Sequence, residues 1–184
     1  MKTPLSFQIT EYDCGPTSLL NALRFLYNRK EIPVEIIKEI YQDTWDKDYH
    51  GTSREAIEIL SNRINKIIEN EVLNIHSSHL TKENVNLEVI KNCLENNGVV
   101  LYRTYQAVEH YSIITKISKK YVYVFDPYYV SASYFRNDTE VKNDFNHLFS
   151  YNRRVTIKRL NSEKKENFAL GPISGREVLL LNKI

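Results

Sequence analysis

The sequence has no long hydrophobic run. No segment approaches the ~20 consecutive apolar residues needed to cross a bilayer, and residues 1–6 contain no apolar signal-peptide core. We therefore expect no membrane partner and a cytoplasmic location. The net charge is only +2 over 184 residues, which is too weak to indicate nucleic-acid binding. With 42% hydrophobic residues, five glycines and five prolines, the composition excludes a disordered or collagen-like chain and is typical of a globular domain.

Cysteine is also scarce. Cys14 and Cys93 are the only two, which is too few for a disulfide framework or a zinc site built on cysteines. The one close histidine pair, His76 and His79, lacks neighbouring cysteine or acidic ligands, and we interpret it as a surface segment. The sequence therefore predicts no metal and no cofactor.

The two halves of the chain differ in their hydrophobic pattern. Residues 1–97 predict a mainly helical lobe and residues 98–184 a mainly β-sheet lobe, which together make one α+β domain over 1–184. Helices are expected to begin near residues 14, 33, 53 and 87, with a further helix over 141–149. The expected strands cover 72–75, 99–102, 111–117, 121–125, 155–160 and 178–181.

The segment around Cys14 carries the strongest local signal. Pro16 suits the first turn of a helix, so Cys14 is expected at the positive end of a helix dipole, which lowers the pKa of a thiol. Backbone N–H groups there can bind an oxyanion, Gly15 leaves space for a substrate carbonyl, and Gln8 supplies a side-chain amide donor. Taken alone, the segment favours a buried structural cysteine at a helix start, because free cysteine is among the most buried residue types. Cys93 lies in the middle of an expected helix, at a packing position.

A predicted hairpin brings a histidine and an aspartate together in the second half. His110 precedes strand 111–117, and Asp126 follows strand 121–125. Since the two strands are joined by the short turn 118–120, the hairpin places both side chains at the same end. A carboxylate beside an imidazole fixes its tautomer and stabilises the imidazolium. With Cys14, these residues fill the three roles of a nucleophilic site.

Tyrosine is abundant, at 13 of 184 residues, and dense near this proposed site. Tyr102, Tyr111 and Tyr128 are candidates to line a substrate cleft. Strands also favour tyrosine for packing alone, so both interpretations stay open.

These motifs together resemble one known family. The order Gln8-x5-Cys14-Gly15, then His110, then Asp126-Pro127 resembles the C39-like cysteine peptidases of the papain-like clan. The segment from His50 to Ser53, before an expected helix, also resembles a motif of that family. The resemblance covers about residues 5–130.

The resemblance implies a papain-like fold with the active site in the cleft between the helical lobe and the sheet lobe. It also implies a role for each matching residue. Cys14 would be the nucleophile, His110 the general base and acid, Asp126 the orienting residue and Gln8 the oxyanion donor.

We therefore expect an enzyme that works through a Cys14 acyl-enzyme, with a peptide or an acyl thioester as its substrate. Peptide hydrolysis is the family default. An alternative is amide synthesis from a carrier-protein thioester in nonribosomal-type peptide biosynthesis, because exchange of a thioester onto a thiolate is nearly thermoneutral. The basic residues 98–184, with 14 Lys and Arg against 8 Asp and Glu, fit an acidic carrier protein. A third alternative is a non-catalytic peptide-binding module.

Overall fold

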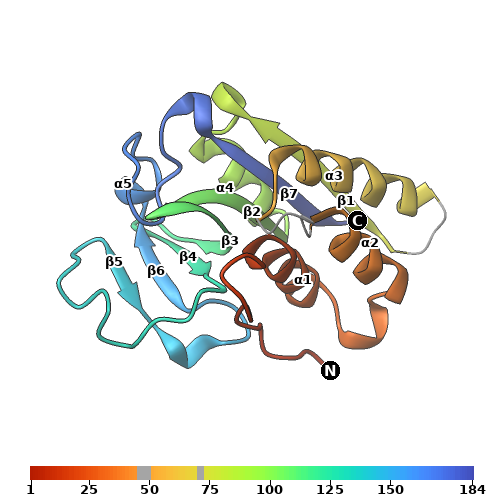
Figure 1. Cartoon of the computed structure of the whole chain (residues 1–184), viewed down its shortest axis with the longest axis horizontal. Helices are drawn as coiled ribbons and strands as arrows, with labels where there is room; N and C mark the ends of the chain where they lie inside the picture. The colour runs from red at the N-terminus through yellow and green to blue at the C-terminus, as the bar shows by residue number, and fades with distance from the viewer. Residues whose placement is uncertain (45–50, 70–72) are drawn as a thin grey trace.

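The computed structural model describes residues 1–44, 51–69 and 73–184. Within this part of the chain, seven strands form one antiparallel sheet in the order β1-β7-β2-β3-β4-β6-β5 (Figure 1). In chain order the strands are β1 (Ile75–Thr81), β2 (Gly98–Gln106), β3 (Val108–Ile117), β4 (Tyr121–Phe125), β5 (Val141–Asn143), β6 (Arg153–Thr156) and β7 (Glu177–Lys183).

Three helices cover one face of this sheet and build the larger core. They are α1 (Cys14–Leu26), α2 (Val34–Thr44) and α3 (Arg54–Glu69). Their buried residues, such as Leu19, Ile40 and Leu60, share one hydrophobic cluster with Leu101 and Ile113 of the sheet. Figure 1 shows α1 crossing in front of the sheet, with α2 and α3 beside it. Helix α1 therefore packs over β3, the strand that carries His110, and over its neighbour β2.

The opposite face is covered by α4 (Leu87–Glu95), α5 (Ile157–Leu160) and the chain around Phe168. Ile90 of α4 packs there with Val100 and Ile114 of the sheet. Alternate residues of β2 and β3 thus point into two different cores, as the period of two of a strand requires.

Local sequence explains where the helices begin. Pro16 lies in the first turn of α1, where its missing N–H costs nothing. The Ser53 hydroxyl accepts a hydrogen bond from the Ala56 N–H at 3.1 Å at the start of α3. Helix α1 is fixed to β3 by the Ser18 hydroxyl, which donates to the Tyr111 carbonyl at 2.9 Å.

The prediction of an α+β fold with an antiparallel sheet is confirmed, and four corrections apply to its details. The sheet crosses the expected boundary at 97/98, because β1 precedes it and pairs with β7. That strand also carries His76 and His79, and His79 is not a surface residue: its Nε2 lies 2.8 Å from the buried carboxylate of Glu177.

The expected helix over 141–149 is instead β5 followed by a short 3-10 helix, Phe145–His147, because the buried Val141 pairs with Val155. The expected strand over 155–160 ends at Thr156. The Thr156 side chain accepts a hydrogen bond from the Arg159 N–H and so caps α5. In the described part of the chain, no helix is both long enough and apolar enough to cross a membrane.

Candidate active site

Cys14 is the first residue of α1 and lies against β3, with only 7% of its surface exposed. Burial alone raises a thiol pKa, but hydrogen bonds from His110 and from the N–H groups of Tyr111 and Gly15, together with the His110 charge, outweigh it and lower the pKa of Cys14. Several donors therefore converge on one sulfur. The arrangement favours the thiolate.

His110 and Asp126 meet at the end of the β3–β4 hairpin, as the sequence predicts. His110 Nε2 lies 2.8 Å from Asp126 Oδ1, which leaves the other ring nitrogen, Nδ1, for Cys14. Strand β3 is bulged between Ile114 and Lys116, and Ile113 pairs with Phe125. Asp126 therefore lies beside Ser112 and reaches His110 along a diagonal of the hairpin.

The charges of Cys14, His110 and Asp126 stabilise one another. Burial lowers the pKa of His110, but Asp126 and Cys14 reverse this effect and raise the pKa to about 10. Burial raises the pKa of Asp126, but the hydrogen bond and charge of His110, then the charge of Arg153, bring it below its usual value. A thiolate, an imidazolium and a carboxylate are thus mutually stabilising at neutral pH.

Two residues that hold Asp126 were not identified from the sequence. Asn152, fully buried, accepts from the Asp126 N–H at 2.8 Å and donates to the Asp126 carbonyl at 2.7 Å. Arg153, also fully buried, points its Nη2 at Asp126 Oδ2 at 3.4 Å. The sequence held a signal for Arg153, because it lies two residues before Val155 and so shares the inward face of β6.

Gln8 lies in the same site, as expected, but its amide is engaged locally. Gln8 Nε2 donates to the Thr10 carbonyl at 2.6 Å, and one of its two hydrogens stays free for another acceptor. The Gln8 N–H donates to the Pro127 carbonyl at 2.9 Å. This bond ties the segment before α1 to the residue after Asp126, and so joins the two halves of the site.

The expectation for Gly15 needs correction. A Cβ at this position would lie 1.9 Å from Thr52 Oγ1, so the space beside Gly15 is filled by Thr52 and not left for a substrate carbonyl. The Thr52 hydroxyl in turn donates to the Thr44 carbonyl at 2.9 Å. Gly15 therefore allows α1 and the segment before α3 to pack closely.

Asp13, which sequence analysis did not single out, organises the loop that precedes Cys14. Its carboxylate accepts hydrogen bonds from the N–H groups of Ile9 at 3.0 Å and Thr10 at 2.7 Å and from the Thr17 hydroxyl at 3.2 Å. Burial raises the pKa of Asp13, but these bonds lower it overall. The loop between Gln8 and Cys14 is thus held by an ionised side chain.

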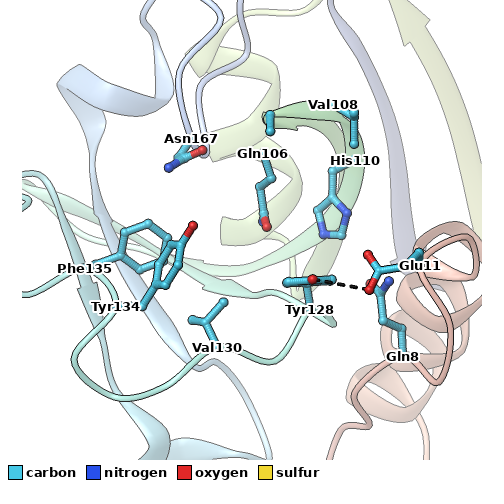
Figure 2. A pocket seen from close by; sticks show the side chains of 11 residues that line it. Gln8, Glu11, Gln106, Val108, His110, Tyr128, Val130, Tyr134, Phe135 and Asn167 are labelled. Carbon is cyan, nitrogen blue, oxygen red and sulfur yellow. Dashed lines mark hydrogen bonds between the residues drawn. The ribbon is translucent and has the colours of Figure 1, made fainter.

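A cleft of about 620 Å³ opens on the His110 side of the site (Figure 2). Figure 2 shows Gln8 and Glu11 at one side, Tyr134 and Phe135 at the other, and the His110 ring between them. The residues that line the cleft are Gln8, Glu11, Gln106, Ala107, Val108, His110, Tyr128, Val130, Tyr134, Phe135 and Asn167.

Of the three tyrosines expected to bind substrate, one lines the cleft and two lie in the hydrophobic cores. Tyr128 lines the cleft, with its ring centroid 6.4 Å from that of His110. Tyr102 is fully buried in the core on the α4 face. Tyr111 is buried on the α1 face, where its hydroxyl donates to Glu177 Oε2 at 2.8 Å. Tyr102 and Tyr111 are therefore core residues and not cleft residues, because strand packing decides their orientation.

The structure does not place the remaining sequence candidates in this site. His50 lies outside the described residues, and His147 is half exposed beside Asp144, 3.8 Å away. Among the residues that the structure describes, no three His, Cys, Asp or Glu side chains are grouped so that they could hold a metal ion.

Comparisons with known proteins agree with the motifs. A family model described as "Peptidase_C39 like family" matches residues 1–158. Among solved structures, the peptidase domain of Streptococcus mutans ComA is similar, with a TM-score of 0.44 and 12% identity, covering 97% of this chain and 98% of that one. No curated protein sequence matches the chain. Because the family model spans most of the 184 residues, the chain belongs to the C39-like peptidase family and is a cysteine peptidase-type protein.

Proposed function

We propose that this protein is a cysteine peptidase that forms an acyl-enzyme on Cys14, with His110 as general base and acid and Asp126 as the orienting residue. The observation that carries the proposal is that one imidazole serves both partners: His110 Nε2 lies 2.8 Å from Asp126 Oδ1, and the same side chain interacts with the Cys14 sulfur and lowers its pKa. The lowered pKa of Cys14 and the raised pKa of His110 both favour a thiolate–imidazolium pair in the resting protein.

The first half-reaction follows from this pair. The Cys14 thiolate attacks the carbonyl carbon of the scissile amide, a C–S bond forms, and the carbonyl oxygen becomes an oxyanion. Backbone N–H groups in the first turn of α1 and the free hydrogen of Gln8 Nε2 are available to stabilise that charge. The imidazolium of His110 then gives its proton to the leaving nitrogen, the C–N bond breaks, and the amine departs.

The second half-reaction uses the neutral imidazole that remains. His110 takes a proton from water as the water oxygen attacks the thioester carbon, and the C–S bond breaks to release the acid and restore the thiolate. Asp126 keeps its hydrogen bond to Nε2 throughout, so Nδ1 stays directed at the reacting atoms.

The cleft supports an extended substrate. It is lined by His110, which protonates the leaving nitrogen, and by Gln8, the donor for the oxyanion, so a substrate chain held there lies next to the scissile bond. Its walls combine aromatic rings such as Tyr134 with the carboxamides of Gln106 and Asn167. These are groups that contact the side chains and the backbone of a peptide.

The same acyl-enzyme would serve amide synthesis if the cleft held an attacking amine instead of a departing one. In that case the donor would be an acyl thioester, including one on a carrier protein. Amines attack thioesters faster than water does, and a bound amine gains further through effective concentration. The experiment below therefore includes this reaction as an outcome.

The proposal is tested by intact-mass spectrometry of the protein mixed with a peptide library or with a simple acyl thioester, followed by an amine chase. A covalent adduct on Cys14 that decays to free acid supports the peptidase. An adduct that decays faster with amine and gives an amide favours acyl transfer instead. If no donor gives an adduct and Cys14 resists alkylation, both enzymatic functions are contradicted and a peptide-binding module is left.

A further inference from the structure

Arg153 is a charged residue in the core of the sheet. It is the first residue of β6, it pairs with Val124 of β4, and none of its surface is exposed. Its Nε has no hydrogen-bond partner among the described residues. Burying a guanidinium in this way is costly unless a nearby charge compensates for it, so the position of its partner matters.

That partner is Asp126. Arg153 Nη2 lies 3.4 Å from Asp126 Oδ2 and donates to the Tyr128 carbonyl at 3.1 Å, while Nη1 donates to the Asn152 carbonyl at 3.0 Å. The guanidinium carbon also lies 5.2 Å from the centre of the Phe145 ring. Asp126, Tyr128, Asn152 and Phe145 thus hold the guanidinium in one place behind the carboxylate.

The two oxygens of Asp126 therefore face two different cations. Oδ1 faces His110 on β3, and Oδ2 faces Arg153 on β6. Cys14 of α1 lies on the far side of His110, so negative and positive groups alternate from the thiolate to the guanidinium. The remaining titratable groups whose charge interacts with Asp126 or Cys14 are three phenols, which are neutral at physiological pH. Tyr102 of β2 and Tyr128 interact with Asp126, and Tyr111 of β3 interacts with Cys14.

We propose that Arg153 is a positioning residue that acts through Asp126 and sets the pH range in which Cys14 is a thiolate. This role rests on the proposed function of Cys14. With Arg153 present, the charges of Cys14, His110, Asp126 and Arg153 sum to zero when Cys14 is a thiolate and His110 is an imidazolium. Without Arg153, the charges of Cys14, His110 and Asp126 sum to one negative charge inside the protein. This charge opposes the loss of a proton from the Cys14–His110 pair, so the thiolate forms at a higher pH.

The test measures how fast iodoacetamide alkylates Cys14 between pH 4 and pH 10. All proteins carry Cys93→Ala, so that Cys14 is the only thiol, and each is checked for folding by circular dichroism. Arg153→Gln removes the charge but keeps a donor for Asp126, and Arg153→Lys keeps the charge. Arg154→Gln is the matched control, because it removes a neighbouring guanidinium that is 42% exposed and faces Asp144 at 3.3 Å.

We expect the rate profile of Arg153→Gln to move to higher pH. At a pH below the midpoint of the parent protein its rate falls about tenfold, since a charge lost near a titrating pair changes its proton affinity by roughly one unit or more. Arg153→Lys and Arg154→Gln keep the parent profile. A structural role alone would lower the folded fraction without moving the midpoint.

The results that would contradict the role of Arg153 differ from those that would contradict the proposed function. If the Arg153→Gln profile coincides with that of the parent, or Arg154→Gln moves it equally, the role of Arg153 is contradicted while the proposed function stands. If Cys14 of the parent reacts only as an ordinary thiol, the proposed function itself fails. Should Arg153→Gln not fold, Arg153→Lys decides, because a tenfold loss below the midpoint with the charge retained contradicts the proposal.

Discussion

Cys14 and Cys93 are both buried, but their thiols have pKa values shifted in opposite directions. Both belong to helices that pack on the central sheet, and both have under a tenth of their surface exposed. Burial raises the pKa of Cys93 to about 11, and hydrogen bonds with Leu181 and Asn182 offset this only in part. The Cys93 thiol donates to Asn182 Oδ1 at 3.4 Å. Cys14 instead meets N–H donors and His110, and its pKa is lowered.

The difference lies in where each residue stands along its helix. Cys14 is the first residue of α1, where backbone N–H groups are unpaired and the helix dipole is positive. Cys93 lies inside α4, where the N–H groups are used by the helix itself. The sulfur environment, and not the degree of burial, therefore separates the thiol with a lowered pKa from the thiol with a raised pKa.

The largest expected effect compares the two cysteines directly. Cys14→Ala abolishes peptidase activity, because no other described thiol contacts His110. Cys93→Ala keeps activity near that of the parent and loses some stability from the space it leaves in the second core. Turnover by each folded variant is the measurement. An active Cys14→Ala protein, or an inactive Cys93→Ala protein, would reverse the assignment.

His110→Ala should make the environment of Cys14 more like that of Cys93. We expect a loss of about 10²–10⁴-fold in kcat, because proton transfer in both half-reactions loses its carrier. Asp126→Asn should cost less, since that residue orients and stabilises the imidazole. Steady-state kinetics of both variants provide the check, and a greater loss in Asp126→Asn than in His110→Ala contradicts these roles.

The pH dependence should be bell-shaped. At low pH the Cys14 thiolate is protonated and activity falls. The imidazolium must protonate the leaving amine, and the pKa of His110 is raised to about 10, so activity should fall again as pH rises through about 10. A profile of kcat/KM that keeps rising beyond that pH would show that the reaction does not use the imidazolium.

The smallest expected effects come from substituting Gly15 and Gly98. Gly15 lies beside Cys14 and Gly98 lies beside Cys93, so the two positions form a matched pair. A Cβ on Gly15 would lie 1.9 Å from Thr52 Oγ1, and one on Gly98 would lie 2.6 Å from Cys93 Sγ. We expect each Gly→Ala change to lower the free energy of unfolding by about 1–3 kcal/mol. Only Gly15→Ala should also lower kcat, because only there does the displaced segment adjoin the site. Equal kinetic losses in both variants would contradict this.

The sequence predicted the parts of the site that are local. The helix start at Cys14 and the hairpin that joins His110 to Asp126 depend on neighbours in the chain, and both are confirmed. Arg153 and Thr52 could not be placed in the same way, because their positions depend on strand order and on contacts between distant segments.

The errors have a similar physical cause. Tyr102 and Tyr111 lie close to His110 along the chain, but the alternation of β2 and β3 turns them into the two cores. The helix expected over 141–149 became β5 because Val141 found a strand partner in Val155. Tertiary pairing decided the structure where local propensity was weak.

One measurement tests the central claim most directly, because it compares both thiols in the same molecules. The native protein is treated briefly with iodoacetamide at pH 7, and label on the peptides carrying Cys14 and Cys93 is counted by mass spectrometry. The account predicts that Cys14 is labelled at least about 100-fold faster, since its pKa is lowered while that of Cys93 is raised to about 11. Equal labelling, or faster labelling of Cys93, would contradict it.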